Sequence, residues 1–333
     1  MKAMVLEAQA AIGSSPLRLS DVPEPEPAPH EVRLKVRCCA ICRTDLHVIE
    51  GDLSPQRLPL IPGHQVVGIV DRVGVACTQL TVGTRVGVAW LRHTCGTCAQ
   101  CRAGRENLCD SARFTGYHAD GGYAEYAVVP EAFAYEIPQA ISDRDAAPLL
   151  CAGIIGYRAL KRSEADSTGN LGLFGFGSSA HVVIQIARHR GMRVFVISRG
   201  EAHQALARRM GAEWAGSDAA HLPEKLDSAI LFAPAGHLVP TALESLNKGG
   251  TLALAGIYLS QVPPLDYERH LFYERNLRSV TANTRQDGRE LLAEAARIPI
   301  RPQTTAYALN EANRALQDLK NDRINGSGIL MAD

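Results

Sequence analysis

The chain has 333 residues, and its 35 Lys and Arg residues balance its 35 Asp and Glu residues. This zero net charge gives no basis for nonspecific binding to nucleic acid or to a membrane surface, both of which need a basic excess. A hydrophobic content of 46% and a charged content of 21% exclude a disordered chain. At about 150 residues per domain, the length predicts two domains.

No apolar run approaches the ~20 residues that a membrane span needs, and Glu7 comes too early for the core of a signal peptide. We therefore expect a cytoplasmic protein. In that reducing compartment the nine cysteines are expected to be metal ligands, catalytic thiols or buried core residues, and not disulfides.

The N-terminal part of the chain is predicted to be rich in strands. Alternating or β-branched apolar segments predict strands at 32–36, 66–70 and 86–89. Proline occupies every second position from 23 to 29, so this segment can be neither a helix nor a central strand. It is predicted to be an extended connector.

The pattern changes after Cys151. Short apolar runs predict strands at 171–176, 193–197, 228–232 and 251–256, and helical spacing predicts helices between them at 180–190, 201–210 and 239–246. This alternation is typical of a parallel sheet with crossover helices. Towards the C-terminus the pattern predicts helices at 290–296 and 311–321 and a last strand at 329–331.

Four cysteines lie close together at C-x2-C-x2-C-x7-C spacing: Cys95, Cys98, Cys101 and Cys109. Four thiolates on one short loop suit tetrahedral zinc with no open position, which is a structural site that staples a loop with little core of its own. The alternatives are a redox C-x-x-C pair, a group of inert thiols, or an iron–sulfur cluster.

A second set of metal donors is scattered along the chain. Cys42, His64 and Cys151 could converge on one zinc and leave its fourth position open for water or substrate, as catalytic sites do. Each of these residues alone is weak evidence, because a lone Cys or His is usually a core residue. Cys38, Cys39 and Cys77 are interpreted as such core residues.

The segment 175–180, Gly-Phe-Gly-Ser-Ser-Ala, fits the G-x-G-x-x-G/A pattern. It follows an apolar strand and opens a helix, which is the context of a dinucleotide-binding turn. The next strand ends in Ser198 and Arg199, without the acid that would hold the ribose hydroxyls of NAD. Arg and a hydroxyl would bind the 2′-phosphate of NADP, with a further contact from His203. The sequence therefore predicts NADP(H) over NAD(H); the alternative is that Arg199 is merely a hydrated surface residue.

Together, these motifs resemble the zinc-dependent medium-chain alcohol dehydrogenases over essentially the whole chain. The resemblance is carried by the segments 42–47, 62–64, 90–91, 115–117 and 121–126 and by the glycine turn. It implies an α/β fold class, with a GroES-like β-rich catalytic domain plus a Rossmann doubly wound parallel sheet. The catalytic domain is expected at 1–150 and 284–333, and the Rossmann dinucleotide-binding domain at 151–283.

The resemblance also implies a role for each site residue. Catalytic zinc would be bound by Cys42, His64 and Cys151, and structural zinc by the four clustered cysteines. Thr44 would hydrogen-bond the substrate oxygen, and His47 would end a proton relay. Asp45 would orient His64. The expected cofactor-binding residues are Arg43, Gly175, Gly177, Ser178, Ser179, Ser198, Arg199, His203, Ala233, Gly256, Ile257, Asn283 and Arg285.

Two positions depart from the family pattern. Gln65 follows the zinc-binding histidine where the family usually has Glu, so a neutral amide replaces a charge thought to assist ligand exchange at zinc. Ser327 follows Gly326 where the family often has a phosphate-binding Arg, which puts more of the pyrophosphate binding on Arg43. Neither departure removes a predicted zinc ligand.

We therefore expect a zinc alcohol dehydrogenase or aldehyde reductase that transfers hydride between NADP(H) and a primary alcohol or aldehyde, with two zinc ions per chain. The alternatives are a zinc secondary-alcohol or polyol dehydrogenase and a non-enzymatic NADPH-binding protein. A zinc-free quinone or enoyl reductase is disfavoured, because such proteins generally lack the set Cys42, His64 and Cys151. The expected partners are a small-molecule substrate and further copies of the chain, in a homodimer or homotetramer, with no nucleic acid and no membrane.

Overall fold

The computed structural model describes residues 1–332, and the chain forms two compact units. Unit 1 comprises Met1–Cys151 and the chain from Ala282 onward, and unit 2 comprises Ala152–Thr281. The chain therefore passes between the units twice, after Cys151 and after Thr281. Within the described residues, no helix is both long enough and apolar enough to cross a membrane.

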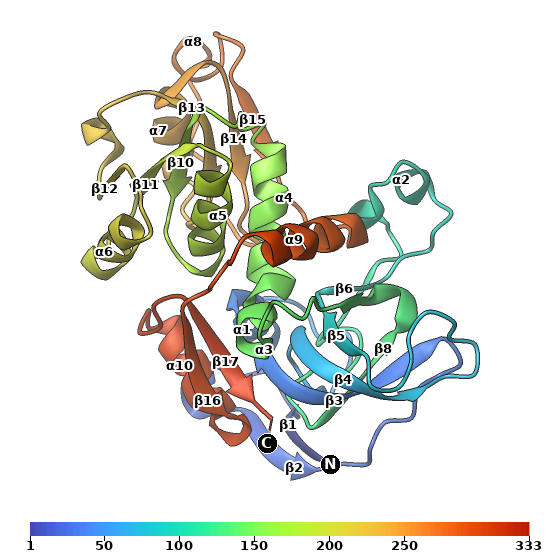
Figure 1. Cartoon of the computed structure of the whole chain (residues 1–333). Helices are drawn as coiled ribbons and strands as arrows, with labels where there is room; N and C mark the ends of the chain where they lie inside the picture. The colour runs from blue at the N-terminus through green and yellow to red at the C-terminus, as the bar shows by residue number, and fades with distance from the viewer. Residues whose placement is uncertain (333) are drawn as a thin grey trace. The chain divides into compact units, whose positions relative to one another are not determined.

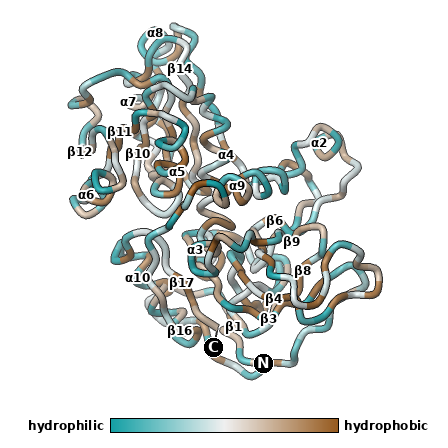
Figure 2. Tube along the Cα trace, viewed as in Figure 1, coloured by the Kyte–Doolittle hydropathy of each residue, from teal (hydrophilic) through white to brown (hydrophobic). Residues whose placement is uncertain are grey.

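Unit 1 is built on a seven-stranded sheet (Figure 1). Six strands run in the order β16-β17-β3-β4-β5-β9, and β8 also pairs with β3. Their bounds are β3 (Glu31–Ala40), β4 (Gln65–Val73), β5 (Arg85–Val88), β8 (Tyr126–Pro130), β9 (Ala134–Glu136), β16 (Thr304–Ala308) and β17 (Ser327–Met331). Hydrophobic residues follow β3, β4 and β17 (Figure 2), and side chains such as Val32, Leu34 and Val66 are completely buried.

Smaller elements surround this sheet. Two short antiparallel pairs are formed by β1 (Lys2–Leu6) with β2 (Leu17–Asp21) and by β6 (Leu91–His93) with β7 (Arg113–Phe114). The α-helices are α1 (Arg43–Glu50), α2 (Ala99–Arg102), α3 (Asp143–Pro148), α9 (Arg285–Arg297) and α10 (Ala312–Lys320). Single turns occur at η1 (Ile12–Ser14), η2 (Glu106–Leu108), η3 (Glu131–Phe133), η6 (Leu309–Glu311) and the π-helical η4 (Leu149–Gly153). The proline-rich segment after β2 has no helix or strand, as predicted.

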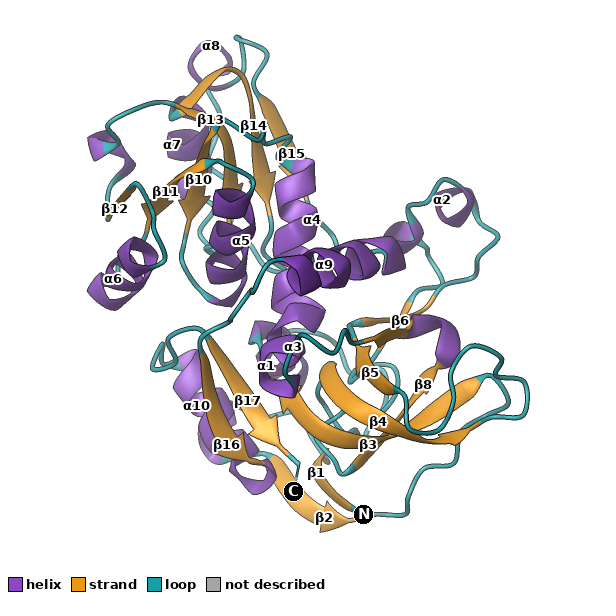
Figure 3. Ribbon diagram, viewed as in Figure 1, coloured by secondary structure: helices purple, strands orange, loops and turns teal. Residues whose placement is uncertain are grey.

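Unit 2 is a six-stranded parallel sheet in the order β12-β11-β10-β13-β14-β15. The strands are β10 (Asn170–Phe174), β11 (Arg193–Ile197), β12 (Trp214–Gly216), β13 (Leu226–Leu231), β14 (Leu246–Leu254) and β15 (Asn276–Ser279). The connecting helices are α4 (Ile154–Arg162), α5 (Ser178–His189), α6 (Glu201–Arg209), α7 (Leu238–Glu244), α8 (Tyr267–His270) and the turn η5 (Ala219–His221) (Figure 3).

The strand order of unit 2 reverses between β10 and β13. Right-handed crossovers then place α5 and α6 on one face of the sheet and α7 on the other, which is the doubly wound arrangement. The predicted fold class is therefore confirmed. Ligands of such sheets bind outside the carboxyl ends of the strands at this reversal.

Most predicted elements exist with shifted ends, but many further elements were not predicted, among them α1, α4 and β15. The missed helix α1 has only a short apolar stripe, with Leu46, Val48 and Ile49 buried, and it is defined mainly by a capping box at Cys42. Its N-cap thus depends on a cysteine, which is not a usual helix start signal.

Candidate active site

Three metal donors from distant parts of the sequence meet in unit 1. Cys42 caps α1, His64 precedes β4, and Cys151 lies in the π-helical turn η4. Their ligand atoms lie within 4.8 Å of one another, and Cys42 Sγ is 3.3 Å from His64 Nε2. Two thiol sulfurs and one imidazole nitrogen are the donor set of an open, three-ligand zinc site. The residues present therefore fit a catalytic zinc ion.

The electrostatics of this cluster favour a cation. The hydrogen bond from Cys151, together with the neighbouring His64, holds the pKa of the Cys42 thiol well below its ordinary value. The same contact, together with burial, raises the pKa of the Cys151 thiol, which keeps its proton. A bound metal ion would replace that proton. Burial lowers the pKa of His64, but Asp45 and the Cys42 thiolate outweigh it and raise this pKa to about 10.

Helix α1 arranges the side chains next to the metal donors. Asp45 is 2% exposed, and its pKa is raised by burial. Thr44 is also buried, and its backbone N–H donates to Cys42 Sγ at 3.3 Å. Thr44 and His47 are three positions apart, so they share one side of the helix. His47 is partly exposed, and its Nδ1 is 2.7 Å from Oδ2 of Asp52, just beyond the end of α1.

Sequence reasoning missed Asp52 and an aromatic stack against the metal donors. The indole of Trp90 meets the imidazole of His64 edge-on, with 4.9 Å between the ring centroids. Phe114 and Tyr117 stack on Trp90, at 4.9 and 5.9 Å. The signals for this apolar wall were the positions of Trp90 and Tyr117, within the family-like segments 90–91 and 115–117. Gln65 beside His64 is buried, and its amide nitrogen has no hydrogen-bond partner among residues 1–332.

The four clustered cysteines form the second donor group. Their sulfurs also lie within 4.8 Å of one another. Backbone N–H groups of Cys95, Cys98 and Cys101 donate to Sγ of Cys109, Cys95 and Cys98 at 3.3–3.4 Å. N–H groups from Thr97 and Cys98 lower the pKa of Cys95 to about 6. A loop that directs N–H donors at sulfurs stabilises thiolates, so this set fits tetrahedral zinc.

The other three cysteines are placed as core residues. Cys38 and Cys39 are buried in β3, and burial raises the pKa of both, to about 12 for Cys38. Cys77 is partly buried and its pKa is also raised by burial. Such thiols are protonated at neutral pH and inert.

The glycine turn of unit 2 lies at the reversal of strand order. Gly175 has φ +93°, and a Cβ there would meet the backbone nitrogen of Ala233 at 2.9 Å, so only glycine fits. Gly177 has no atom within 4 Å of its would-be Cβ, which leaves open space in front of α5. Ser178 and Ser179 begin α5 itself, where backbone N–H groups favour anions.

The remaining predicted cofactor residues of unit 2 gather at the same edge of the sheet. Ser198 directly follows β11 and is buried, whereas Arg199 is exposed. His203 lies in the first turn of α6, close to Gly200. Gly256 and Ile257 follow β14, and Ile257 is exposed. Gly175 follows β10 and Ala233 follows β13, so the predicted cofactor residues of unit 2 lie at the carboxyl ends of the neighbouring strands β11, β10, β13 and β14.

Three predicted cofactor residues belong to unit 1. Arg43 is exposed in the first turn of α1. Asn283 is buried, and its amide donates to the backbone oxygen of Thr284 at 3.1 Å. The guanidinium of Arg285 is engaged by Glu106 within the same unit. Its cofactor role stays a prediction, and this pairing counts against it.

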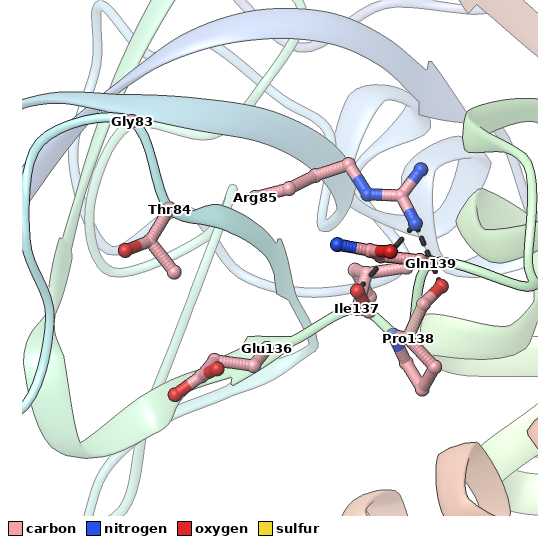
Figure 4. A pocket seen from close by; sticks show the side chains of 7 residues that line it. All are labelled: Gly83, Thr84, Arg85, Glu136, Ile137, Pro138 and Gln139. Carbon is pink, nitrogen blue, oxygen red and sulfur yellow. Dashed lines mark hydrogen bonds between the residues drawn. The ribbon is translucent and has the colours of Figure 1, made fainter.

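A hollow of about 550 Å³ is lined by residues 83–85 and 136–139, at β5 and β9, and none of these residues is a metal donor (Figure 4). Arg85 points into it but donates to the backbone oxygens of Pro138 and Ile141, at 2.7 and 2.8 Å, and to Asp143 at 3.0 Å. Because these acceptors occupy the guanidinium, we assign the hollow no binding role.

Known proteins match the chain along its whole length. The family model described as the alcohol dehydrogenase GroES-like domain matches residues 28–139, and the one described as zinc-binding dehydrogenase matches residues 180–297. A probable alcohol dehydrogenase AdhA of Mycobacterium tuberculosis is 49% identical, over 99% of this chain and 97% of its own. An alcohol dehydrogenase of Geobacillus stearothermophilus is 33% identical over 100% of both chains.

Solved structures agree with these relatives. A cinnamyl alcohol dehydrogenase from Sorghum bicolor is 27% identical, with a TM-score of 0.90 over 99% of this chain and 97% of its own. A Sinorhizobium meliloti protein, assigned as a zinc-binding dehydrogenase and bound to NADP, is 26% identical, with a TM-score of 0.86 over 99% of both chains.

Proposed function

Because the chain belongs to the zinc-dependent medium-chain alcohol dehydrogenase family, we propose that it interconverts primary alcohols and aldehydes with NADP(H). Unit 1 is the zinc-binding catalytic domain, and unit 2 is the dinucleotide-binding domain. The observation that carries the proposal is the convergence of Cys42, His64 and Cys151 in unit 1. A zinc ion there and a nicotinamide would supply a Lewis acid and a hydride acceptor.

The chain's own residues would bind the substrate and move its proton. The hydroxyl of Thr44, next to the donor Cys42, accepts the hydrogen of the substrate hydroxyl. His47, on the same side of α1, holds the released proton before it reaches solvent. Its Nδ1–H faces Asp52, so Nε2 is the nitrogen that accepts. The aromatic wall of Trp90, Phe114 and Tyr117 excludes water on the side of His64.

The preference for NADP(H) rests on the end of β11. No carboxylate follows this strand directly, whereas Ser198 and the exposed Arg199 supply a hydroxyl and a cation for a 2′-phosphate. The pyrophosphate would lie at the start of α5, in front of Gly177.

Three further features belong to the proposal. Each chain binds two zinc ions, a catalytic ion at Cys42, His64 and Cys151 and a structural ion in the four-cysteine loop. The protein is a homodimer or homotetramer. A cytoplasmic location is compatible with nine cysteines that are all free.

A panel of alcohols and aldehydes, assayed at 340 nm with both cofactors and with zinc content measured, tests the proposal. We expect turnover of primary substrates, faster with NADP(H), and loss of turnover in a folded Cys42→Ala variant. Preference for secondary alcohols or polyols would select the alternative dehydrogenase. Cofactor binding without turnover of any substrate, in fully zinc-loaded protein, would leave only a binding protein.

A further inference from the structure

Glu106 and Arg285 of unit 1 form an ion pair joined by several hydrogen bonds. Arg285 donates from Nε at 3.0 and 3.1 Å and from Nη2 at 2.7 Å to the carboxylate, and its backbone N–H donates to Oε1 at 2.7 Å. The guanidinium also lies over the ring of Phe133, 4.5 Å from its centroid. Burial raises the pKa of Glu106, but Arg285 outweighs it and holds this pKa below its ordinary value.

Glu106 is part of the four-cysteine loop. It lies between Cys101 and Cys109, in the turn η2. Much of the loop is exposed, including Gly96, Thr97 and the residues 102–105, whereas Glu106, Asn107 and Cys109 are buried. The contact with Arg285 is therefore a major attachment of the loop to the rest of unit 1. Figure 1 shows α9 extending beside this loop.

Arg285 ends the segment where the chain returns from unit 2 to unit 1. Ala282 has φ +48°, a conformation that alanine adopts only when its surroundings impose it. The next residues are held within unit 1: Asn283 lies beside the Tyr135 hydroxyl, and Thr284 caps α9 through Asp287. Arg285 is the last of these attachments, and it contacts the four-cysteine loop through Glu106.

We propose that Glu106 couples metal binding in the four-cysteine loop to the order of residues 282–285, which makes Arg285 a positioning residue. The proposal rests on zinc occupying this loop. A metal ion held by Cys101 and Cys109 would fix both ends of the stretch that carries Glu106. Without it, a loop whose residues 96–97 and 102–105 are exposed would hold the carboxylate less firmly and release it more often.

Loss of that carboxylate would have two effects on residues 282–285, where the chain returns to unit 1. The first N–H of α9 would lose its acceptor, and the neutralising partner of a half-buried guanidinium would be gone. Residues 283–285 would then open more often. By thermodynamic reciprocity, breaking the pair would also weaken metal binding by the loop.

The test is hydrogen exchange of the peptide containing residues 282–287 in the full-length, zinc-loaded protein. The variants are Cys98→Ala, which removes the loop metal, Glu106→Gln, and the two combined. Glutamine has the same shape as glutamate, but it loses the negative charge, and its NH2 group cannot accept hydrogen bonds from Arg285. Each single substitution is expected to raise the hydrogen-exchange rate of this peptide about tenfold. The double substitution should raise the rate no further, because both substitutions act on the same contact between Glu106 and Arg285.

The matched control is Glu224→Gln, which breaks the exposed pair of Glu224 with Arg193 in unit 2 and should leave this peptide unchanged. If Cys98→Ala does not fold, Arg285→Lys is the alternative variant. It keeps the positive charge but loses the planar guanidinium that donates to both oxygens of Glu106. We expect this variant to release zinc faster to a chromophoric chelator. Additive effects, or unchanged exchange in Glu106→Gln, would overturn the coupling alone. The finding that purified wild-type protein holds no metal in the four-cysteine loop would overturn both the coupling and the assignment of structural zinc. It would not bear on alcohol oxidation, which the 340 nm assay tests separately.

Discussion

Oδ1 of Asp45 lies 3.1 Å from Nδ1 of His64, and Oδ2 of the same carboxylate accepts the backbone N–H of Cys42 at 2.8 Å. One buried carboxylate thus positions two of the three catalytic metal donors. It faces the ring nitrogen of His64 opposite the one near Cys42, so it orients Nε2 towards the metal position. The carboxylate and the two donors lie together at the start of α1.

Asp45→Asn is expected to weaken zinc binding at the Cys42 site about 10- to 100-fold, because a neutral amide orients His64 less firmly and lowers its basicity. Metal content after dialysis against graded chelator measures this. Asp71→Asn, which disturbs the Arg33 pair elsewhere in unit 1, is the control and should retain wild-type metal content. Equal zinc affinity in wild type and Asp45→Asn would contradict the role of Asp45.

Asp52→Asn is expected to lower kcat for alcohol oxidation about tenfold, a part of the 10²–10⁴-fold that general acid–base groups contribute. The asparagine would no longer select the Nδ1–H tautomer of His47. The double variant with His47→Ala should be no slower than His47→Ala alone. Asp21→Asn, which loses only the exposed Lys2 pair, is the control. A normal kcat in Asp52→Asn would show that His47 needs no orienting partner.

Arg199→Asp should move the cofactor preference towards NAD(H). Loss of a charge-assisted contact to the 2′-phosphate, worth about 1.5–3 kcal/mol, predicts a fall of about 10- to 100-fold in kcat/KM for NADP(H). The ratio of kcat/KM values for the two cofactors measures it. Arg209→Asp, at the far end of α6, makes the same charge change and should leave the ratio unaltered. An equal ratio in wild type and Arg199→Asp would remove the basis of the NADP(H) proposal.

The buried His181 should make unit 2 sensitive to acid. It is completely buried in α5, near the Gly177 backbone oxygen, and burial lowers its pKa to about 4. The unfolded chain therefore binds the proton first. The stability that neutral His181 provides is complete above about pH 6.5 and is lost as the pH falls towards 4, by about 1.4 kcal/mol per unit.

His181→Gln should flatten this dependence between pH 7 and pH 5, because glutamine does not titrate. Urea midpoints followed by the fluorescence of Trp214, in β12 of unit 2, measure it. His221→Gln, on the exposed turn η5, should keep the wild-type slope. A wild-type slope in His181→Gln would show that other groups cause the acid sensitivity.

The chain's local patterns determined much of this protein. Apolar periodicity predicted the parallel sheet of unit 2, because each strand and crossover helix is a short local segment. The spacing of Cys95, Cys98, Cys101 and Cys109 predicted a metal loop for the same reason, since all four donors lie within one stretch. For Cys42, His64 and Cys151, which are far apart in the sequence, the residue types only allowed a second site, and the resemblance to a family supported it.

Only the tertiary structure decided how distant residues meet. It brought Trp90 to His64 and Glu106 to Arg285, and the second of these contacts gives Arg285 a partner other than the predicted cofactor. Neither of these contacts has a signature in local periodicity or spacing. Side-chain contacts across long sequence separations depend on where the strands and loops end in space, and a linear pattern of residue types does not encode this position.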